Sequence, residues 1–228
     1  MSVNPEIELT ADGSHTLFIP ELDEHYHSVN GGAIQESTHV FIRTGLHTIS
    51  KQKIIVFEVG FGTGLNAFLT LLDAQSSGKE IHYITLEAYP LSAAITNRLN
   101  YADNYTEEEK SLFIGLHKAE WGGRETEVTP SFYLTKLEVD FTTFDFSLIK
   151  DLVDLIYFDA FAPDKQPDMW SQRIFDQLYA ITAPPNGILV TYCAKGAVRR
   201  MMQQAGYTVE RLPGPPGKRE MLRATRTI

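Results

Sequence analysis

Four acidic residues stand where predicted buried strands end, a position in which a carboxylate has a chemical use. They are Glu58, Glu87, Asp140 and Asp159. Asp159 closes the apolar run 152–158 and leads into the turn 160–163. A carboxylate in such a place can hold an amine and accept a proton from it. Any one of these acids could be a helix cap or a surface residue, but four strands that all end this way favour one shared site.

The stretch VFEVGFGTGLNAF has three glycines where an apolar strand turns into a helix. Glycine there lets the backbone approach a ligand closely, and the helix N-terminus favours a negative group. A dinucleotide site needs Gly or Ala where this chain has Leu65, so the NAD interpretation weakens. The acidic G-x-G-x-G pattern indicates S-adenosylmethionine (SAM) instead, with backbone NH groups meeting its methionine carboxylate. The predicted cofactor residues of this stretch are Glu58, Gly60, Phe61, Gly62, Gly64, Leu65 and Asn66.

The acids at the ends of the next strands could bind the other parts of SAM, its ribose and its adenine. Glu87 follows Gly60 by 27 residues, about where an acid is needed to bind both ribose hydroxyls. Asp140, with Phe141 beside it, is predicted to accept a hydrogen bond from the adenine amino group. In an open α/β sheet ligands bind beyond the carboxyl ends of the strands, so these residues and Asp159 should converge there and contact the cofactor.

Strand-like and helix-like segments alternate along most of the chain. Apolar runs predict strands at 53–60, 81–88, 132–140, 152–158 and 187–193, and helical spacing predicts helices at 33–48, 65–75, 91–99, 105–117, 171–181 and 196–204. The alternation indicates an α/β fold of the Rossmann-like class I SAM-dependent methyltransferase type, a doubly wound and mostly parallel sheet with a C-terminal antiparallel hairpin. Residues 1–50, an N-terminal hairpin and a helical extension, should pack on a catalytic domain of residues 51–228.

Composition limits the classes of protein that this chain can belong to. With 228 residues and 43% hydrophobic content it can bury a full core, and it has no signal-peptide pattern and no apolar run of membrane-spanning length. We therefore expect a cytoplasmic protein with no membrane partner. Cys193 is the only cysteine, which excludes a disulfide framework. His25 and His27 lack the carboxylate pattern of a metal site, so no metal is predicted.

Charge is distributed unevenly along the chain. The net charge is −9, but residues 193–228 hold eight basic residues against two acidic ones. On charge alone a solvated surface is favoured over a nucleic-acid face.

Three longer stretches resemble one family. EVGFGTGLNAF, YFDAFAPDKQPDMW and VRRMMQQAGYTVERLPGPPGKREML are similar to the methyltransferase half of the bifunctional tRNA-modification enzyme MnmC and to its stand-alone counterpart MnmD, over residues 26–222. The resemblance implies methyl transfer from SAM to the exocyclic amine of 5-aminomethyl-(2-thio)uridine at the tRNA wobble position. The segment EHYHSVNGGAIQESTHVF resembles the same family and implies that Tyr26, Ser28 and Glu36 lie near the cofactor.

This chemistry gives roles to the residues around Asp159. Asp159 would hold the amine and accept its proton, directly or through water. Phe161, with Tyr157 or Trp170, would stack on an unpaired uracil of the anticodon loop, although packing of Trp170 at the start of the next helix is an equal expectation. Pro163 would stiffen the turn. The remaining predicted substrate contacts are Lys165 and, toward phosphates, Lys195, Arg199, Arg200, Lys218 and Arg219.

The resemblance also implies that oxidation and methylation are carried out by separate proteins. MnmC carries an FAD-dependent oxidase, and no second dinucleotide pattern follows KREML here, so we expect methylation only, with a separate oxidase acting upstream. Three other functions stay open: a class I methyltransferase acting on a small amine, an aminopropyltransferase using decarboxylated SAM, and a non-catalytic RNA-binding module. The sequence predicts no oligomeric state.

Overall fold

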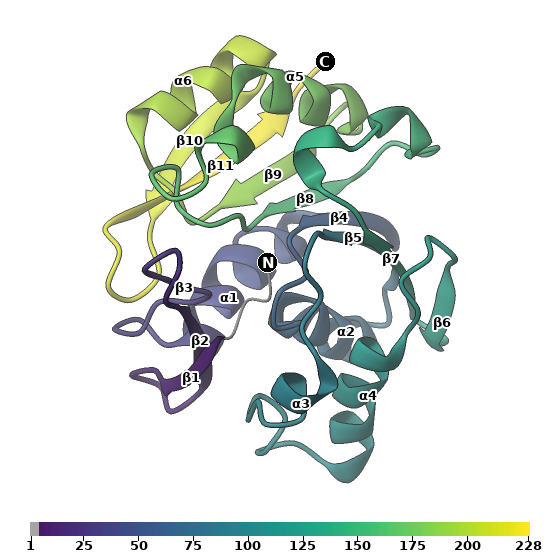
Figure 1. Cartoon of the computed structure of the whole chain (residues 1–228). Helices are drawn as coiled ribbons and strands as arrows, with labels where there is room; N and C mark the ends of the chain where they lie inside the picture. Colours follow the sequence, from purple (N-terminus) through teal and green to yellow (C-terminus); the bar gives the residue numbers. More distant parts are fainter. Residues whose placement is uncertain (1–4) are drawn as a thin grey trace.

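The computed structural model describes residues 5–228, and its centre is an eight-stranded sheet (Figure 1). The strands are β4 Lys53–Val59, β5 Glu80–Glu87, β6 Thr126–Thr129, β7 Phe132–Glu138, β8 Leu155–Phe158, β9 Gly187–Thr191, β10 Thr208–Pro213 and β11 Glu220–Arg226. They lie in the order β10-β11-β9-β8-β4-β5-β7-β6. The inner pairs from β7 to β9 are parallel, whereas β11 is antiparallel to both of its neighbours. The predicted sheet, with its C-terminal antiparallel hairpin, is confirmed.

Helices cover both faces of this sheet (Figure 1). They are α1 Ala33–Ser37, α2 Leu65–Ser77, α3 Ala93–Thr96, α4 Glu107–Lys118, α5 Gln172–Ile181 and α6 Gly196–Ala205. The predicted helix 33–48 is divided, because α1 continues into a π-helical turn, Thr38–Arg43, and then a 3-10 turn, Leu46–Thr48. Both the backbone NH and the hydroxyl of Thr44 donate to the His39 carbonyl, which widens the helix at this point.

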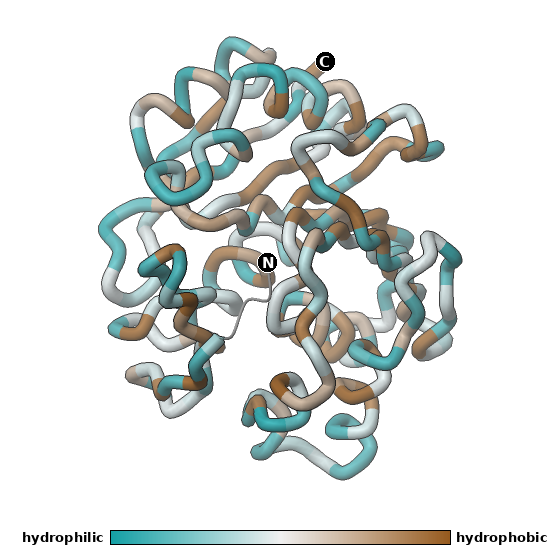
Figure 2. Tube along the Cα trace, viewed as in Figure 1, coloured by the Kyte–Doolittle hydropathy of each residue, from teal (hydrophilic) through white to brown (hydrophobic). Residues whose placement is uncertain are grey.

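The two faces of β4 separate the hydrophobic core into two clusters. Ile54 and Val56 pack with residues of α2, while Phe57 and Val59 face the other side and pack with residues of α5. This alternation is the period of two that a strand imposes on its side chains. Figure 2 shows the hydrophobic segments concentrated in the central strands. Both faces of the strand are therefore buried, which explains its near-continuous apolar run.

The N-terminal segment forms a small three-stranded sheet beside the main one. Its strands are β1 Glu6–Leu9, β2 His15–Ile19 and β3 Glu24–His25, and the predicted hairpin is confirmed by the antiparallel pairing of β1 with β2. His27 is buried, and its Nε2 lies 2.9 Å from the Thr63 hydroxyl in the glycine-rich loop. The segment thus packs against the glycine-rich loop, while a domain boundary at residue 50 stays a prediction. The first four residues of the proposed N-terminal region lie outside the described chain.

One strand of the sheet, β6, was not predicted from the sequence. β6 pairs antiparallel with β7 at the sheet edge, but its residues TEVT are polar and mostly exposed, so they carry no apolar strand pattern. Within residues 5–228, no helix has both the length and the apolar character needed to cross a membrane.

Candidate active site

One large cavity opens at the carboxyl ends of the parallel strands. Its volume is about 1360 Å³. The segments that follow β4, β5, β7 and β8 line it, and the N-terminal segment from Ile19 to Glu36 closes the opposite side. Most of the predicted cofactor and acceptor residues meet here: Tyr26, Ser28, Glu36, Gly60, Phe61, Gly62, Leu65, Asn66, Glu87, Asp140, Phe141, Asp159, Phe161, Lys165 and Lys218.

The glycine-rich loop brings bare backbone to the cavity wall. Gly60, Gly62 and Gly64 have φ values of +87°, +49° and +72°, a region that residues with a side chain rarely adopt. A methyl group on Gly62 would also lie 2.9 Å from the ring of Tyr26. Both the backbone conformation and the lack of space therefore explain glycine at position 62.

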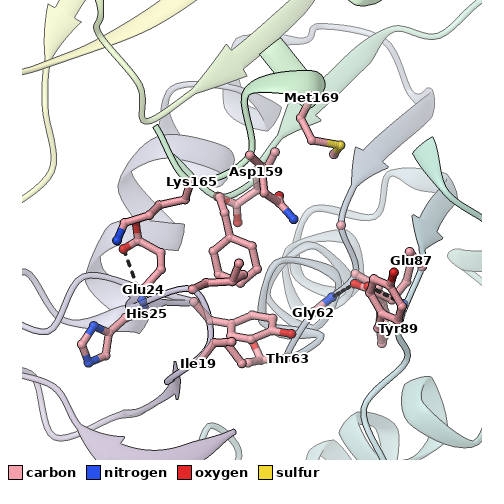
Figure 3. Close-up of a pocket in the computed structure, with 18 of the residues that line it drawn as sticks. Ile19, Glu24, His25, Gly62, Thr63, Glu87, Tyr89, Asp159, Lys165 and Met169 are labelled. Carbon is pink, nitrogen blue, oxygen red and sulfur yellow. Dashed lines mark hydrogen bonds between the residues drawn. The ribbon is translucent and has the colours of Figure 1, made fainter. Parts of the chain in front are cut away.

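Glu87 closes β5 and reaches back to this loop (Figure 3). Its Oε2 accepts the Gly62 NH at 3.0 Å and its Oε1 accepts the Tyr89 NH at 3.0 Å. Burial raises the pKa of Glu87, and the backbone NH groups oppose that rise. Each carboxylate oxygen has a second lone pair, so hydroxyls of a ligand can still be accepted, and ribose binding by Glu87 stays a prediction.

Asp140 lies at the exposed rim of the cavity, after β7. Its Oδ1 caps the following 3-10 turn by accepting the backbone NH of Thr142 at 2.8 Å. The carboxylate has a second oxygen, Oδ2, that can accept a hydrogen bond, and binding of the adenine amino group by Asp140 stays a prediction. Phe141 beside it is buried and lines the cavity.

Asp159 follows β8 and lines the cavity (Figure 3), as do the glycine-rich loop and Phe161. Its Oδ2 accepts a hydrogen bond from Asn66 Nδ2 at 2.8 Å. Burial raises the pKa of Asp159 to about 7, and the nearby Glu36 carboxylate acts in the same direction. A carboxyl group with a pKa close to neutrality can take up and release a proton at physiological pH.

An ion pair between the buried Glu36 and the partly exposed Lys218 joins the N-terminal segment to the β10–β11 loop at the same wall. Glu36 accepts the Ser28 NH at 2.8 Å and the Lys218 Nζ at 2.6 Å. Lys218 Nζ also lies 3.8 Å from the centre of the Tyr192 ring. The Lys218 side chain pairs with Glu36 but is still 29% exposed, so its contact with a phosphate stays a prediction. Tyr192 was not predicted, although it follows strand β9 as the other site residues follow theirs.

The aromatic residues near Asp159 divide into two groups. Phe161 and Tyr26 both line the cavity and meet edge to face, with ring centroids 5.0 Å apart. Tyr157 is fully buried, and Trp170 is 5% exposed with its Nε1 donating to the Phe161 carbonyl at 2.8 Å. The prediction that Tyr157 or Trp170 stacks on a base is therefore wrong. The Tyr157 side chain lies in the core, and the Trp170 side chain is buried and holds the loop that contains Phe161.

The role predicted for Glu58, a contact with the cofactor, also needs correction. Its side chain is fully buried below the glycine-rich loop and does not line the cavity, so it is not placed to touch a cofactor. Its Oε2 accepts the Thr85 hydroxyl at 2.9 Å, while its Oε1 has no hydrogen-bond partner among residues 5–228. Burial raises the pKa of Glu58 to about 8. Gly64 also lies outside the cavity lining and serves as the left-handed cap at the start of α2.

Four of the predicted phosphate contacts lie outside the main cavity, namely Lys195, Arg199, Arg200 and Arg219. A shallow second hollow next to it is lined by Pro163, Lys195, Lys218 and Arg219, among others. Lys195 pairs with Asp164, and Lys165 pairs with Asp23 at 3.3 Å. Arg199 and Arg200 line neither hollow and sit on α6. The basic end of the chain is thus only partly gathered near the cavity.

Lys136 is a buried residue near the site that was not predicted from the sequence. It is 1% exposed, and its Nζ donates to the carbonyls of Leu116, His117 and Ala119 at the end of α4. The same ammonium lies 4.8 Å from the centre of the Phe61 ring. Burial lowers the pKa of Lys136 to about 8. A lysine in a strand pattern normally indicates a surface position, so no sequence signal could have found it.

Among residues 5–228, no group of three or more His, Cys, Asp and Glu side chains is arranged to hold a metal ion.

Comparison with known proteins adds the family context. Residues 124–227 match a family described as S-adenosyl-L-methionine-dependent methyltransferase. The chain is 31% identical to a protein of Pseudoalteromonas atlantica named tRNA 5-methylaminomethyl-2-thiouridine biosynthesis bifunctional protein MnmC, over 95% of this chain and 33% of that protein. A protein of the same name from Marinomonas sp. is 28% identical over 88% of this chain and 31% of its own length. The chain thus spans about a third of the curated relatives it matches.

A solved structure supports the fold. The crystal structure of MNMC2 from Aquifex aeolicus superposes with a TM-score of 0.76 at 24% identity, covering 98% of this chain and 71% of that one. The arrangement of strands and helices is therefore shared along nearly the whole chain.

Proposed function

We propose that this chain is an S-adenosyl-L-methionine-dependent methyltransferase of the MnmC kind. In this proposal it methylates the exocyclic amine of 5-aminomethyl-(2-thio)uridine at the tRNA wobble position, giving 5-methylaminomethyl-(2-thio)uridine. The names of the relatives motivate the choice of substrate. The observation that carries the proposal is the Asp159 carboxyl, with a pKa near 7, on the wall of a cavity that a glycine-rich loop and an aromatic side chain also line.

The residues around the loop fit the cofactor. Its backbone is free of side chains at Gly60 and Gly62, and the Glu87 carboxylate stands beside it on the same wall. We propose that this loop holds the methionine end of SAM, Glu87 the ribose and Asp140 the adenine. SAM would supply an electrophilic methyl group. Because displacement at that group needs alignment more than covalent help from the protein, positioning supplies most of the catalysis.

Asp159 handles the proton in this proposal. A primary ammonium has no lone pair, so the amine must lose a proton before it can act as a nucleophile. The Asp159 carboxylate can accept that proton, directly or through water, because its raised pKa brings it close to neutrality. Backbone carbonyls of 160–163 can accept the remaining N–H bonds of the amine.

The acceptor base would lie against the wall formed by Phe161 and Tyr26. Both rings are partly exposed in the cavity, and an unpaired base is commonly bound by stacking on an aromatic ring. Lys165 stands at the rim of the same wall. A wobble base is unpaired in the free anticodon loop, so turning it into the cavity costs little.

The second hollow extends this acceptor wall onto the surface. Lys195 and Arg219 line it, and Pro163 joins it to the loop after Asp159. We propose that these two residues contact phosphates of the anticodon loop, with Arg199 and Arg200 on α6 adding to the positive field. The proposal also includes a cytoplasmic location and a separate FAD-dependent oxidase that acts upstream.

The test is nucleoside mass spectrometry of tRNA that carries 5-aminomethyluridine, incubated with the protein and SAM. The expected result is a mass gain of one methyl group on that nucleoside alone. A parallel reaction with free small amines separates the alternative of a small-molecule methyltransferase, and decarboxylated SAM separates an aminopropyltransferase. Absence of the methyl gain on tRNA, with SAM bound, would refute the assignment of the substrate.

A further inference from the structure

Lys136 is a buried ammonium whose three hydrogen-bond partners are all main-chain carbonyls. It lies in β7 and is 1% exposed. Its Nζ donates to the carbonyls of Leu116, His117 and Ala119 at 3.0, 3.1 and 3.0 Å, at the carboxyl end of α4. An ammonium has three N–H donors, and here each of them has its own acceptor. The end of a helix carries partial negative charge, so it is a favourable place for a cation.

The neutral form of this lysine would not suit the same three carbonyls. An amine has only two N–H donors, and it would turn its lone pair toward the third acceptor. A carbonyl that loses its donor inside the protein is costly. The arrangement therefore requires the charged form of Lys136, although burial lowers the pKa of this residue to about 8.

His117 connects the end of α4 to the glycine-rich loop. Its Nε2 lies 3.1 Å from the Thr63 carbonyl, and because a carbonyl only accepts, Nε2 carries the proton and donates. The His117 ring also meets the Phe61 ring edge to face, with centroids 5.4 Å apart. A methyl group on Gly64 would lie 2.9 Å from His117 Nε2. The lack of a side chain at Gly64 therefore leaves the space that the His117 ring occupies.

Lys136 also contacts the loop directly. Its Nζ lies 4.8 Å from the centre of the Phe61 ring and 4.2 Å from that of Trp121. Phe61 and Thr63 line the cavity, whereas Lys136 and His117 do not. Lys136 and His117 thus act on the loop from behind the cavity wall.

We propose that Lys136 is a positioning residue for SAM: its ammonium fixes the end of α4, from which His117 holds the glycine-rich loop in the conformation that binds the cofactor. The part that concerns SAM rests on the proposed function. The connection between Lys136 and the loop is a property of the chain itself.

The titratable groups around Lys136 determine how a pH effect is assigned. On α4, burial and then the Lys136 charge lower the pKa of His117 to about 4, so this ring is neutral above pH 6. On β4, Glu58 lies beyond Thr85, which is in register with both Glu58 and Lys136. Burial raises the pKa of Glu58 to about 8, so it titrates in the same range as Lys136. The acids near Lys136 in sequence are exposed, namely Glu120 and Glu138. A pH effect therefore belongs to Lys136 only where a Lys136 variant loses it.

NMR of the free protein, labelled with ¹⁵N at histidine, tests the connection without any ligand. In the wild type the His117 signals should show a protonated Nε2, and they should shift near pH 8 as Lys136 loses its proton. Lys136→Met should lose this step. Lys118→Met, which changes the exposed lysine that follows His117 on the same helix, should retain it. A wild-type protein without the step, or a step of equal size in Lys136→Met, would overturn the connection.

Glu58→Gln provides a second variant should Lys136→Met fail to fold. It removes the other group that titrates near pH 8, so a step that it retains belongs to Lys136. Loss of the His117 step in Glu58→Gln would assign it to Glu58 and contradict the proposal.

Calorimetric titration with S-adenosylhomocysteine, which is SAM without its reactive methyl group, tests the consequence for the cofactor. At pH 7 Lys136→Met should bind it about tenfold more weakly, the equivalent of one hydrogen bond to a charged group. Lys118→Met should bind it as tightly as the wild type does. Equal affinity in Lys136→Met and the wild type would remove Lys136 from the positioning role.

A double-mutant cycle separates a shared contact from two independent losses of stability. His117→Leu removes the donor to Thr63 at similar volume, and it should also weaken binding of S-adenosylhomocysteine. The double variant should be weakened by less than the product of the two single factors, because both changes release the same loop. Two factors that multiply would show that Lys136 does not act through His117. If the wild type binds neither S-adenosylhomocysteine nor SAM, the proposed cofactor fails, while the His117 titration still decides whether Lys136 holds the loop.

Discussion

At the scale of single residues, Glu58 and Asp159 show how surroundings divide one functional group into two roles. Both are acids at the ends of neighbouring parallel strands, β4 and β8. Asp159 lines the cavity and has an ammonium nearby, whereas Glu58 lies below the glycine-rich loop with a partner at only one oxygen. Both residues were predicted at the site from the sequence. How deeply each side chain is buried depends on how the following loop folds over the end of the strand, and no local sequence pattern contains that information.

Asp159→Asn should retain SAM binding and lower the rate of methyl transfer. The new side chain is the same size, and its carbonyl oxygen can still accept from Asn66, but it cannot take the proton of the amine. General-base catalysis is typically worth about 10²–10⁴-fold, so a loss of that order is expected. The measurement is single-turnover rate together with SAM affinity by calorimetry.

In the wild-type protein the same rate should depend on pH with a defined sign. Asp159 can accept a proton only when ionised, so the rate should fall as pH drops below about 7. A turnover unchanged in Asp159→Asn would show that the amine loses its proton to another group or to water alone.

At the scale of elements, the loop between β4 and α2 is held from outside the strand–helix unit. Tyr26 from the N-terminal segment lies against Gly62, and His117 from α4 contacts the Thr63 carbonyl through Nε2 at 3.1 Å. Lys136, in turn, caps α4 and lies against the Phe61 ring. The GFGTG pattern predicted the loop, but its supports come from distant segments, so only the folded chain reveals them.

Gly62→Ala should weaken SAM binding, and Gly78→Ala is its matched control. Both glycines have positive φ, +49° and +71°, so alanine at either should cost about 1–2 kcal/mol of stability. A methyl group on Gly62 would clash with Tyr26, while one on Gly78 at the end of α2 would meet nothing within 4 Å. Calorimetric titration with SAM and thermal unfolding separate the two effects. Equal SAM affinity in both variants would contradict the role of the bare backbone at Gly62.

At the scale of the whole molecule, the sequence predicted the order of layers better than the directions of individual side chains. Continuous apolar runs identify β4 and β8 because both faces of these strands are buried, and the acids after them mark the carboxyl edge. Lys218 was predicted only as a phosphate contact, and its pairing with Glu36, 182 residues away in sequence, was not predicted. Pairings over such separations are set by topology, which local composition does not encode.

Arg219→Glu should weaken tRNA binding, because Arg219 is exposed and lines the hollow beside the acceptor wall. One lost phosphate contact should reduce the slope of log affinity against log salt by about one. Lys118→Glu is the control, an exposed lysine at the end of α4 and away from the β10–β11 loop (Figure 1). Equal salt slopes for the two variants would remove the second hollow from the proposed tRNA surface.

The buried acids should make the free energy of unfolding fall between pH 6.5 and 8. Burial raises the pKa of Glu58 to about 8 and that of Asp159 to about 7, so the folded state holds protons that the unfolded state has already released. Stability therefore falls with rising pH, by about 1.4 kcal/mol per unit for each such group, until its folded pKa is passed. His27 and His117, with pKa values lowered to about 4 by burial, are neutral in the folded state over this range but half protonated in the unfolded chain at pH 6.5. Together they therefore offset roughly 0.8 kcal/mol of the fall between pH 6.5 and 8.

Below pH 6.5 the two histidines act on the free energy of unfolding in the opposite direction to the two acids. They become protonated in the unfolded chain first, which lowers stability as pH falls and offsets the gain from the two acids. Stability should therefore be greatest in mildly acidic solution and lower at pH 8 by about 2 kcal/mol, the share that Glu58 alone contributes over 1.5 pH units. Urea unfolding at pH 6.5 and 8 measures this difference. Glu58→Gln, which cannot ionise, should show a smaller decrease than the wild type, and an equal decrease would mean that Glu58 is already charged in the folded protein.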